Sequence, residues 1–328
     1  MLKIAIVGTG GIAQRHMRGL ATIPDARFVA MVDRDRKRAE EAAHIFGGEV
    51  FDTLKDALPH VDVVYVLTPP SFHRELSVQA LRAKKQVIVE KPIAIKIEDA
   101  ESMVEEAEKA GVQLIVTFNM RFRKGFRKLK ATVESGKLGP IVNLWSQRLG
   151  IGFGEEYNWR TDPKLLCGMS IESLSHDIDL IRWFGGDISN VRANTYNSRK
   201  DLPGFDDSAN VALTMKSGAG AMIHSCWHSY AGLNSRGVVG EEGTAYVSGP
   251  GLWECTGLHW KTKDMENEQI EVFHDPLDDA SYLEENRHFL ECIDEGSTPL
   301  VTGMDGLKAL RVSHGILKSS RENCIVTI

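Results

Sequence analysis

The chain has 328 residues, of which 42% are hydrophobic and 26% charged, and its net charge is −6. This length suits two domains, and the acidic balance excludes the strongly basic surface that attracts nucleic acid or anionic lipid. No apolar run approaches the roughly 20 residues that span a bilayer, and a strand-like segment stands where a signal peptide would lie. The five cysteines are scattered without Cys-x-x-Cys spacing, which disfavours a disulfide framework or a structural zinc site. We therefore expect a cytoplasmic protein with neither a nucleic-acid nor a membrane partner.

Short apolar segments alternate with helical patterns over the first 118 residues. The segments are rich in β-branched residues and lack polar alternation, as expected of parallel strands buried on both faces. The pattern predicts an α/β fold with a doubly wound parallel sheet of the Rossmann type. Predicted strands cover 2–7, 27–32, 61–67, 86–89 and 113–118, and predicted helices cover 11–22, 35–46, 72–83 and 97–110.

The first strand leads directly into the glycine motif Gly8-Thr9-Gly10-Gly11-Ile12-Ala13, which opens a helix. In such a G-x-G-x-x-A motif the first glycine permits the tight turn, and the second lets the backbone approach a pyrophosphate. The alanine lets the helix pack close to the strand, and the N–H groups at the helix start face the anion. The residues predicted to bind the pyrophosphate of a dinucleotide are Gly8, Gly10, Gly11, Ile12 and Ala13.

Asp33 ends the second strand, 20 residues after Ala13. A carboxylate at this place suits the ribose hydroxyls of NAD and repels the 2′-phosphate of NADP. Arg34 leaves NADP open, because its guanidinium could bind that phosphate. Asp33 can also be interpreted as a helix N-cap or turn residue. We predict NAD as the cofactor, with Asp33 and Arg34 at its ribose.

Two further segments follow predicted strands, at the edge where doubly wound sheets bind their ligands. Thr68-Pro69-Pro70 follows the strand over 61–67, and His73 lies just inside the next helix. The other interpretation of His73 is a solvated residue of the first helical turn. Glu90-Lys91-Pro92 follows the strand over 86–89. The cofactor-binding residues predicted here are Thr68, Pro69, His73, Glu90 and Lys91.

The alternation of strands and helices ends near 118–122. A helix over Lys124–Ser135 precedes several strand-like stretches, with Lys216-Ser217-Gly218 as a hairpin turn. We expect a second, α+β domain with a large, mostly antiparallel sheet, and domain limits of 1–120 and 121–328. The final helix is free in this scheme to pack on either domain. Predicted strands cover 141–149, 209–215, 219–227 and 243–248, and predicted helices cover 169–184, Tyr282–Asp294 and Asp305–Ser319.

The helix over 169–184 carries polar residues on one side. Glu172, His176 and Asp179 fall at i, i+4 and i+7, opposite an apolar face, so they are expected to be neighbours. One interpretation is a solvated polar face. Another is catalysis, since a histidine is a suitable proton acceptor near neutral pH. A zinc site is the least favoured, because no other cluster completes its ligand set, and we predict no metal.

These motifs together resemble the Gfo/Idh/MocA family of oxidoreductases. The resemblance rests on Gly8–Ala13, Thr68-Pro69-Pro70, Glu90-Lys91-Pro92, Trp159-Arg160 and the run His176-Asp177-Ile178-Asp179. It implies oxidation of sugar or cyclitol hydroxyls, or reduction of the matching ketones, with NAD. It also implies that Lys91 lies in the active site, with a cis bond before Pro92, and that His176 is the acid/base. Glu172 stands where many members have aspartate as the partner of that histidine, and Leu174 where many have glycine.

The chemistry implied by the resemblance gives each catalytic residue a role. His176 accepts the hydroxyl proton, protonated Lys91 hydrogen-bonds the same oxygen, and Glu172 orients the histidine. For the other predicted substrate contacts, surface or core packing is the competing interpretation. The predicted substrate-binding residues are Lys91, Asn119, Arg121, Tyr157, Trp159, Arg160, Glu172 and His176.

Three functions remain open at this point. The leading prediction is an NAD-dependent dehydrogenase of a small carbohydrate or cyclitol. The second is an enzyme that uses bound NAD transiently, for epimerisation, elimination or glycoside cleavage. The third is a non-catalytic dinucleotide sensor, against which the set Lys91, Glu172 and His176 argues. The resemblance further implies a homodimer or homotetramer.

Overall fold

The computed structural model describes residues 1–152, 159–162, 165, 167–202, 204–275 and 280–328. The chain divides into two compact units: unit 1 comprises Met1–Asn119 and Asp279–Leu310, and unit 2 comprises Met120–Asp278 and Arg311–Ile328. The expected limits of 1–120 and 121–328 differ from these units at residues 279–310, which belong to unit 1. Among the described residues, no helix is long and apolar enough to cross a membrane.

Unit 1 is built on a six-stranded parallel sheet of order β3-β2-β1-β4-β5-β6. This confirms the predicted doubly wound sheet, whose direction of winding reverses between β1 and β4. The sequence pattern did not predict β3, because a strand of two residues leaves no periodic signal. The strands are β1 (Leu2–Val7), β2 (Ala26–Val32), β3 (Glu49–Val50), β4 (Val63–Val66), β5 (Gln86–Val89) and β6 (Leu114–Val116).

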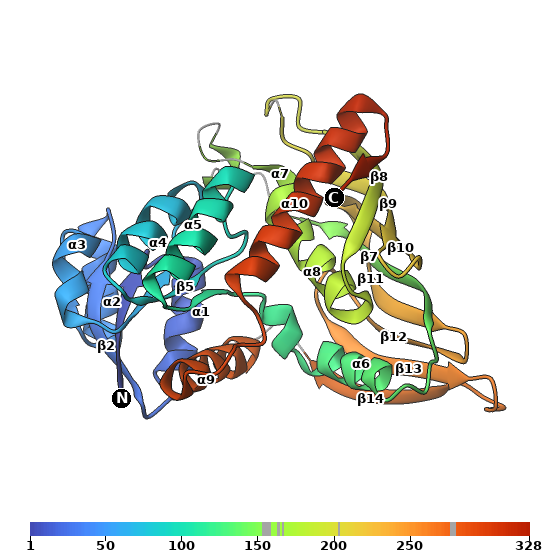
Figure 1. Cartoon of the computed structure of the whole chain (residues 1–328), viewed down its shortest axis with the longest axis horizontal. Coiled ribbons are helices and arrows are strands. Elements are labelled where there is room, and N and C mark those ends of the chain that lie inside the picture. The colour runs from blue at the N-terminus through green and yellow to red at the C-terminus, as the bar shows by residue number, and fades with distance from the viewer. Residues whose placement is uncertain (153–158, 163–164, 166, 203, 276–279) are drawn as a thin grey trace. The chain divides into compact units, whose positions relative to one another are not determined.

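The helices of unit 1 flank this sheet (Figure 1). Helix α1 packs against α9, and α4 packs against α5. Helix α5 has the predicted bounds and ends at Gly111, whose φ of 67° is left-handed. The short α3 was not predicted. The helices are α1 (Gly11–Leu20), α2 (Arg36–Phe46), α3 (Leu54–Ala57), α4 (His73–Arg82), α5 (Ile97–Ala110) and α9 (Ala280–Glu295), with 3₁₀ turns η1 (Leu58–His60), η2 (Pro70–Phe72) and η3 (Asn119–Phe122).

Glycines lie at close contacts between residues 279–310 and the rest of unit 1. A Cβ on Gly19 of α1 would lie 3.1 Å from the Cα of Leu283 in α9. Helix α10 (Gly303–Glu322) approaches β6, where a Cβ on Gly306 would lie 2.7 Å from a methyl of Val116. From Arg311 onward α10 belongs to unit 2. Glycine at these contacts lets the backbones of the helices approach their neighbours closely. A pattern of apolar residues does not predict such contacts.

Unit 2 is built on a nine-stranded sheet of order β14-β13-β12-β11-β7-β10-β9-β8-β15. The pairing is antiparallel except between β7 and β10, so the predicted mostly antiparallel sheet is confirmed. The turn at 216–218 joins β9 to β10, with Gly218 at φ 93°. The strands are β7 (Ile141–Ile151), β8 (Ile188–Tyr196), β9 (Ser208–Met215), β10 (Gly220–Cys226), β11 (His228–Gly240), β12 (Gly243–Gly249), β13 (Cys255–Thr262), β14 (Gln269–Asp275) and β15 (Val326–Thr327). Of these, β8, β11, β13, β14 and β15 were not predicted.

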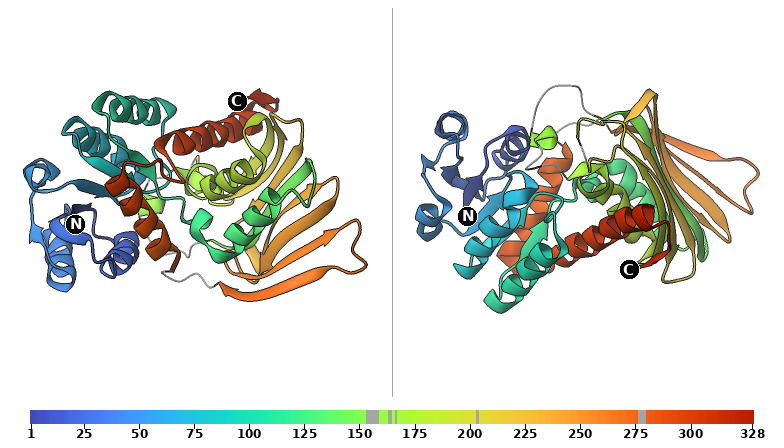
Figure 2. Two further views of the ribbon diagram at one scale, coloured as in Figure 1. Left: turned by 60° about the horizontal axis from the view of Figure 1, so that its bottom comes forward. Right: turned by 90° about the horizontal axis from the view of Figure 1, so that it is seen from above.

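Helices cover one face of the large sheet (Figure 2). The described elements α6 (Lys124–Glu134) and α8 (Leu174–Gly185) pack against its strands. Along β9 buried and exposed residues alternate without exception from Ala209 to Met215, as a sheet with one covered face requires. Met222 of the neighbouring β10 is 49% exposed on the other face.

The predicted helix over 169–184 is two helices. Helix α7 (Gly168–Glu172) ends at Ser173, whose φ of −102° and ψ of −39° stay in the right-handed helical region, and α8 begins at Leu174. The single-helix prediction missed this one-residue break near its start, because the apolar periodicity runs through the break. Leu174, Ile178 and Ile181 are buried, as their spacing predicted.

Candidate active site

Gly8 ends β1 in a conformation that only glycine adopts without strain. Its φ is 88°, and an added Cβ would lie 2.8 Å from the carbonyl oxygen of Leu67. Its N–H donates a 2.8 Å hydrogen bond to the carbonyl of Val32. The turn is thus tied to the ends of the neighbouring strands, and the protein itself requires glycine here.

Gly10 and Gly11 differ from Gly8, because the described residues give no reason for them. A Cβ on either would meet no described atom within 4 Å, and Gly10 has an extended φ of −71°. Helix α1 has no side-chain cap and no acidic residue in its first turn. Open space beside uncapped N–H groups fits an anion such as the pyrophosphate of NAD. Ala13 is fully buried, as its predicted packing role requires, and Ile12 is half-buried.

Asp33 connects the glycine loop to the end of β2. One oxygen, Oδ2, accepts hydrogen bonds from the backbone N (2.8 Å) and hydroxyl (3.1 Å) of Thr9. The other, Oδ1, accepts from the backbone N of Asp35 at 2.9 Å, and Asp35 itself caps α2. The carboxylate is therefore a turn residue and at the same time lies beside the loop, where it fits a ribose. Arg34 is exposed.

His73 is fully buried, so its interpretation as a solvated residue was wrong. Its Nε2 lies 2.8 Å from the carbonyl oxygen of Thr68, and its Nδ1 lies 2.9 Å from that of Pro92. Burial lowers the pKa of the ring. The ring thus holds the loop after β4 to the loop after β5. His73 therefore positions both loops. Thr68 and Pro69 belong to the loop after β4 and are half-buried.

Glu90 fixes the backbone of Lys91. It is 6% exposed, and its Oε2 accepts a 2.9 Å hydrogen bond from the N–H of Lys91. Its Oε1 lies 3.2 Å from Nε2 of His16 in α1. Burial raises the pKa of Glu90, but hydrogen bonding and charge from His16 and the charge of Lys91 lower it more, and the net direction is down. The bond between Lys91 and Pro92 is cis, as the resemblance implied.

Glu172 and His176 of unit 2 lie on either side of the helix break at Ser173. They are 7% and 6% exposed, so a solvated polar face is excluded. Oε1 of Glu172 accepts hydrogen bonds from Nε (3.3 Å) and Nη2 (3.1 Å) of Arg160. Glu172 is therefore an ion-paired carboxylate. Trp159, Arg160, Glu172 and Trp227 line one small hollow of about 10 Å³, the space of a single water molecule.

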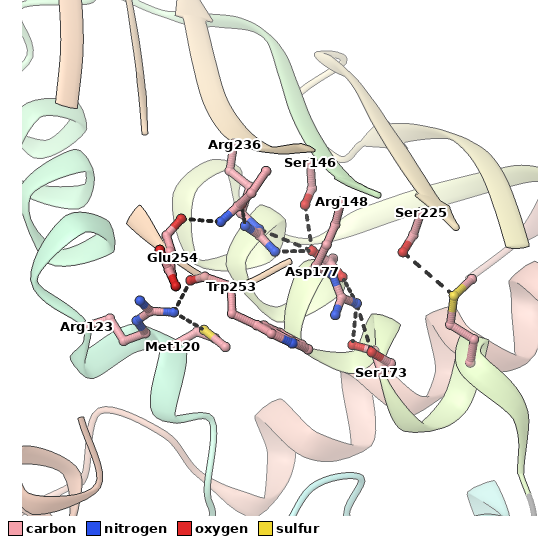
Figure 3. Close-up of polar contacts among 12 residues, drawn as sticks. Met120, Arg123, Ser146, Arg148, Ser173, Asp177, Ser225, Arg236, Trp253 and Glu254 are labelled. Atoms are coloured by element: carbon pink, nitrogen blue, oxygen red, sulfur yellow. Dashed lines mark hydrogen bonds and ion pairs between the residues drawn. The ribbon is translucent and has the colours of Figure 1, made fainter. Parts of the chain in front are cut away.

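Buried arginine side chains surround this helix break (Figure 3). Nη2 of Arg148 donates to the carbonyl (3.2 Å) and hydroxyl (2.9 Å) of Ser173, which holds the ends of α7 and α8 in place. The guanidinium lies 4.1 Å from the ring centre of Trp253, and the ring centres of Trp253 and His176 lie 5.7 Å apart in an edge-to-face arrangement. The ring of Trp253 thus contacts both Arg148 and His176.

Asp177 balances two of these arginines. It is fully buried in α8 and accepts hydrogen bonds from Ser146 (2.6 Å), Arg148 (2.7 Å) and Arg236 (3.2 Å). Burial raises its pKa, but the charges of both arginines lower it more, so it is ionised. One carboxylate faces two guanidinium groups, and this group of charges is net positive next to Glu172 and His176.

Asp206 anchors the start of α7. Its Oδ2 accepts from the backbone N (3.0 Å) and hydroxyl (2.5 Å) of Ser170. Burial raises its pKa from 3.8 to about 6, because the loss of water outweighs the hydrogen bonds from Ser170. The element that carries Glu172 thus starts at a carboxyl group that titrates near neutral pH.

The remaining predicted substrate residues have structural partners or lie outside the described residues. Arg121 forms a buried ion pair with Asp179 at 2.5 Å, and the amide of Asn119 donates to Ser281 at 3.4 Å within unit 1. Tyr157 lies outside the described residues. Trp159 lies under the guanidinium of Arg160, 4.5 Å from its ring centre. Within the described ranges no group of three or more His, Cys, Asp or Glu is arranged to hold a metal ion.

Sequence reasoning missed several residues that build the site. Asp177 stands next to His176 in the run that was recognised, but its burial depends on strands that were not all predicted. Arg148 and Arg236 carried no signal, since long cationic side chains are mostly exposed. His16 does lie one turn after Ala13, on the face of α1 that turns toward the sheet, and that spacing was the available signal.

Two family models match the chain. Residues 2–118 match "Oxidoreductase family, NAD-binding Rossmann fold", and residues 126–246 match "GFO/IDH/MocA C-terminal domain". The myo-inositol 2-dehydrogenase of Thermotoga maritima is 30% identical over 98% of this chain and 97% of its own length. The chain belongs to the Gfo/Idh/MocA family. The scyllo-inositol 2-dehydrogenase (NAD(+)) of Bacillus subtilis is 28% identical over 100% of this chain and 96% of its own. A solved structure, aldose-aldose oxidoreductase from Caulobacter crescentus complexed with glycerol, is 27% identical with a TM-score of 0.88, covering 100% and 99% of the chains.

The two glycines of this family member's loop make a matched pair for testing. Gly10→Ala should lower NAD affinity by about tenfold or more, while the free energy of unfolding changes by less than about 0.5 kcal/mol. Gly8→Ala should instead cost about 1–3 kcal/mol of stability, because its left-handed backbone is strained by any side chain. Titration calorimetry with NAD and denaturant unfolding of the free protein measure the two quantities. Equal destabilisation by both substitutions would contradict the distinction.

Asp177→Asn removes the counter-charge of two buried arginines. We expect a loss of about 3–5 kcal/mol in the free energy of unfolding, the usual result of leaving a buried charge uncompensated. Asp201, which pairs with Arg199 at the surface, serves as the control, and Asp201→Asn should change little. Urea unfolding of the two variants checks this, and a similar stability for both would show that the charge cluster is dispensable.

Asp206 should make stability depend on pH. Its folded pKa is raised, so the protonated form is favoured in the fold, and stability is highest below the unfolded value of 3.8. Stability should fall as the pH rises toward about 6, by up to about 3 kcal/mol, since the shift spans 6 − 3.8 = 2.2 units. In Asp206→Asn this decline should be absent. Denaturant unfolding of the wild type and Asp206→Asn from pH 4 to pH 7 measures this difference. If the free energy of unfolding changes with pH in the same way for both proteins, Asp206 is not the group responsible.

Proposed function

We propose that the protein is an NAD-dependent dehydrogenase that acts on a hydroxyl-bearing carbon of a sugar, sugar derivative or cyclitol. The observation that carries this proposal is the buried Glu90 carboxylate, which fixes Lys91 directly after β5. The glycine loop follows β1 of the same parallel sheet. Carboxyl ends of parallel strands share one edge, so an amine for the substrate and a loop for the cofactor lie on one side of the sheet.

The loop Gly8–Ala13 would hold the pyrophosphate, and Asp33 the adenosine ribose, with Thr68 and Pro69 beside them. NAD, when bound, supplies the acceptor for the hydride that leaves the carbinol carbon. The Asp33 carboxylate supports NAD over NADP, because it repels a 2′-phosphate. Arg34, exposed beside it, is the reason to compare both cofactors in the assay.

His176 is proposed as the group that takes the hydroxyl proton. A neutral imidazole nitrogen accepts that proton as the carbon is oxidised. The Nζ of Lys91 would donate a hydrogen bond to the same substrate oxygen and stabilise its negative charge.

Glu172 departs from the aspartate of many family members, and its observed partner is Arg160. The ion pair at 3.1 Å holds the carboxylate next to Trp159 and Trp227. Carboxylate and guanidinium side chains beside aromatic rings suit a polyol, which offers hydroxyls for hydrogen bonds and C–H faces for the rings. We therefore propose two roles for Glu172: it binds substrate hydroxyls, and its negative charge stabilises the protonated form of His176.

The relatives support the substrate class. Both inositol 2-dehydrogenases match this chain over nearly its whole length, although at only 30% and 28% identity. Which sugar or cyclitol is used is therefore a matter for a screen of sugars, sugar acids and inositols with NAD and NADP. Turnover without net NADH would favour the redox-neutral alternative, and tight NAD binding without any turnover would favour a sensor.

We also propose a homodimer or homotetramer, from the resemblance. The exposed face of the unit 2 sheet supports this, because apolar side chains such as Met222 and Val272 are 49% and 80% exposed there. Light scattering of the full chain measures the oligomeric state.

The catalytic assignment predicts that Lys91→Ala and His176→Ala each lower turnover by about 10²-fold or more. NAD affinity should change little, because neither side chain is assigned to bind the pyrophosphate or the ribose. Lys109 and His224 serve as controls: Lys109 pairs with Glu105 on the surface of α5, and His224 bonds Gln147 on the sheet. Full turnover in either alanine variant of Lys91 or His176 would remove that residue from the mechanism.

A further inference from the structure

Glu285 is a buried acid that the proposed reaction does not use. It lies in α9 of unit 1, is fully buried, and neither carboxyl oxygen has a hydrogen-bond partner among the described residues. Its Oε1 lies 3.9 Å from Nε2 of His16. A carboxyl group buried without partners is costly unless it is protonated.

The same ring nitrogen of His16 also serves Glu90, at 3.2 Å. The other ring nitrogen, Nδ1, lies 3.1 Å from Oδ1 of Asn286, whose amide group donates to the carbonyl of His16 at 3.3 Å. Both ring nitrogens therefore face oxygen acceptors, and both contacts are hydrogen bonds only when the ring is doubly protonated. With both ring nitrogens protonated, His16 is the cation that matches the buried Glu90 carboxylate.

Two carboxyl groups thus compete for one N–H. With Glu285 protonated, the cluster is one carboxylate and one imidazolium, and His16 belongs to Glu90. With Glu285 ionised, a second negative charge would lie at similar distance from the same nitrogen, and Glu90 would lose part of its partner's attraction. Because Glu90 holds the N–H of Lys91, the consequence reaches the catalytic turn.

We propose that His16 and Glu285 are positioning residues for Lys91, with the proton on Glu285 deciding which carboxylate His16 serves. The catalytic meaning of this inference rests on the proposed role of Lys91. The structural link itself needs only the contacts among α1, the end of β5 and α9.

The electrostatic surroundings support a protonated Glu285. The titratable groups that face it are His16 from α1, Glu90 from the end of β5 and Tyr65 from β4. On its own helix, Tyr282 packs edge-to-face with His16, with the two ring centres 5.1 Å apart, and the guanidinium of Arg15 lies 5.7 Å from the ring centre of Tyr282. Burial, and then the charge of Glu90, raise the pKa of Glu285 well above its ordinary value. Raising the pH is therefore the way to ionise it.

Glu285→Gln removes the competition without changing the size of the side chain. The control is Glu284→Gln, which takes a charge from the neighbouring half-buried position that pairs with Arg287. Lys91 can be observed directly by pulse labelling with an amine-reactive ester at a series of alkaline pH values. Mass spectrometry of the peptides gives the labelling rate of Lys91 relative to the exposed Lys109 in the same sample.

In the wild type and in Glu284→Gln, the relative rate should show a step as Glu285 ionises, beyond the titration of Lys91 itself. Glu285→Gln should lack that step, and above it the labelling rate of Lys91 should differ about threefold from that of the wild type. Superimposable profiles for Glu285→Gln and the wild type would overturn the proposal. If Glu285→Gln does not fold, Glu285→Met offers a neutral, unbranched replacement for the same measurement.

The labelling needs neither substrate nor turnover, so its outcome is separate from that of the proposed function. If the step depends on Glu285 but no polyol is oxidised, the positioning link stands and the dehydrogenase assignment fails. If a substrate is found, the alkaline limb of kcat should move to higher pH in Glu285→Gln. An unchanged limb together with an unchanged labelling profile would leave Glu285 as a packing residue only.

Discussion

Ionised Glu90, buried beside the imidazole of His16, is the interaction on which the organisation of unit 1 depends. A carboxylate without water must be matched by donors, and here they come from α1 and from the backbone of Lys91. The match joins the helix of the glycine loop to the turn after β5. His73 adds a second link between the loops after β4 and β5. The edge of the sheet where cofactor and substrate chemistry is proposed is therefore built from buried polar contacts.

Unit 2 also contains a buried group of charges, but here positive charge is in excess. Its centre holds Arg148 and Arg236 around Asp177, and the excess positive charge lies close to the helix break between Glu172 and His176. An uninterrupted helix would give Glu172 and His176 the fixed i, i+4 relation that the sequence suggested. Glu172, before Ser173, pairs with Arg160, while His176, after it, packs on Trp253. The longer glutamate side chain fits this arrangement, because its partner lies outside its own helix.

Local signals were sufficient for much of the fold. Five strands of unit 1 and the bounds of α5 followed from apolar runs, glycine ends and strand spacing. Strands such as β11 and β13 were missed because glycines and polar residues interrupt their alternation. The sequence was sufficient to predict the glycine loop, Asp33 and the Glu90-Lys91-Pro92 turn, because each is a contiguous feature next to a predicted strand. The clusters that hold them were not, because His16, Glu90 and Glu285 meet only after residues 279–310 fold back on the first half of the chain.

The placement of Asp177 also has a consequence for how the large sheet can assemble. Ser146 on β7 and Arg236 on β11 are directly opposite each other in the antiparallel ladder, and both donate to this one carboxylate. If β11 slipped along β7 by a single residue, its side chains would exchange faces and Arg236 would turn away from Asp177. The hydrogen bonds of Asp177 therefore depend on the alignment of β7 with β11. Only the native register brings the three donors Ser146, Arg148 and Arg236 to this carboxylate. Misaligned sheets would leave guanidinium groups without their anion, so the charge cluster penalises misfolded forms of unit 2 as well as stabilising the native one.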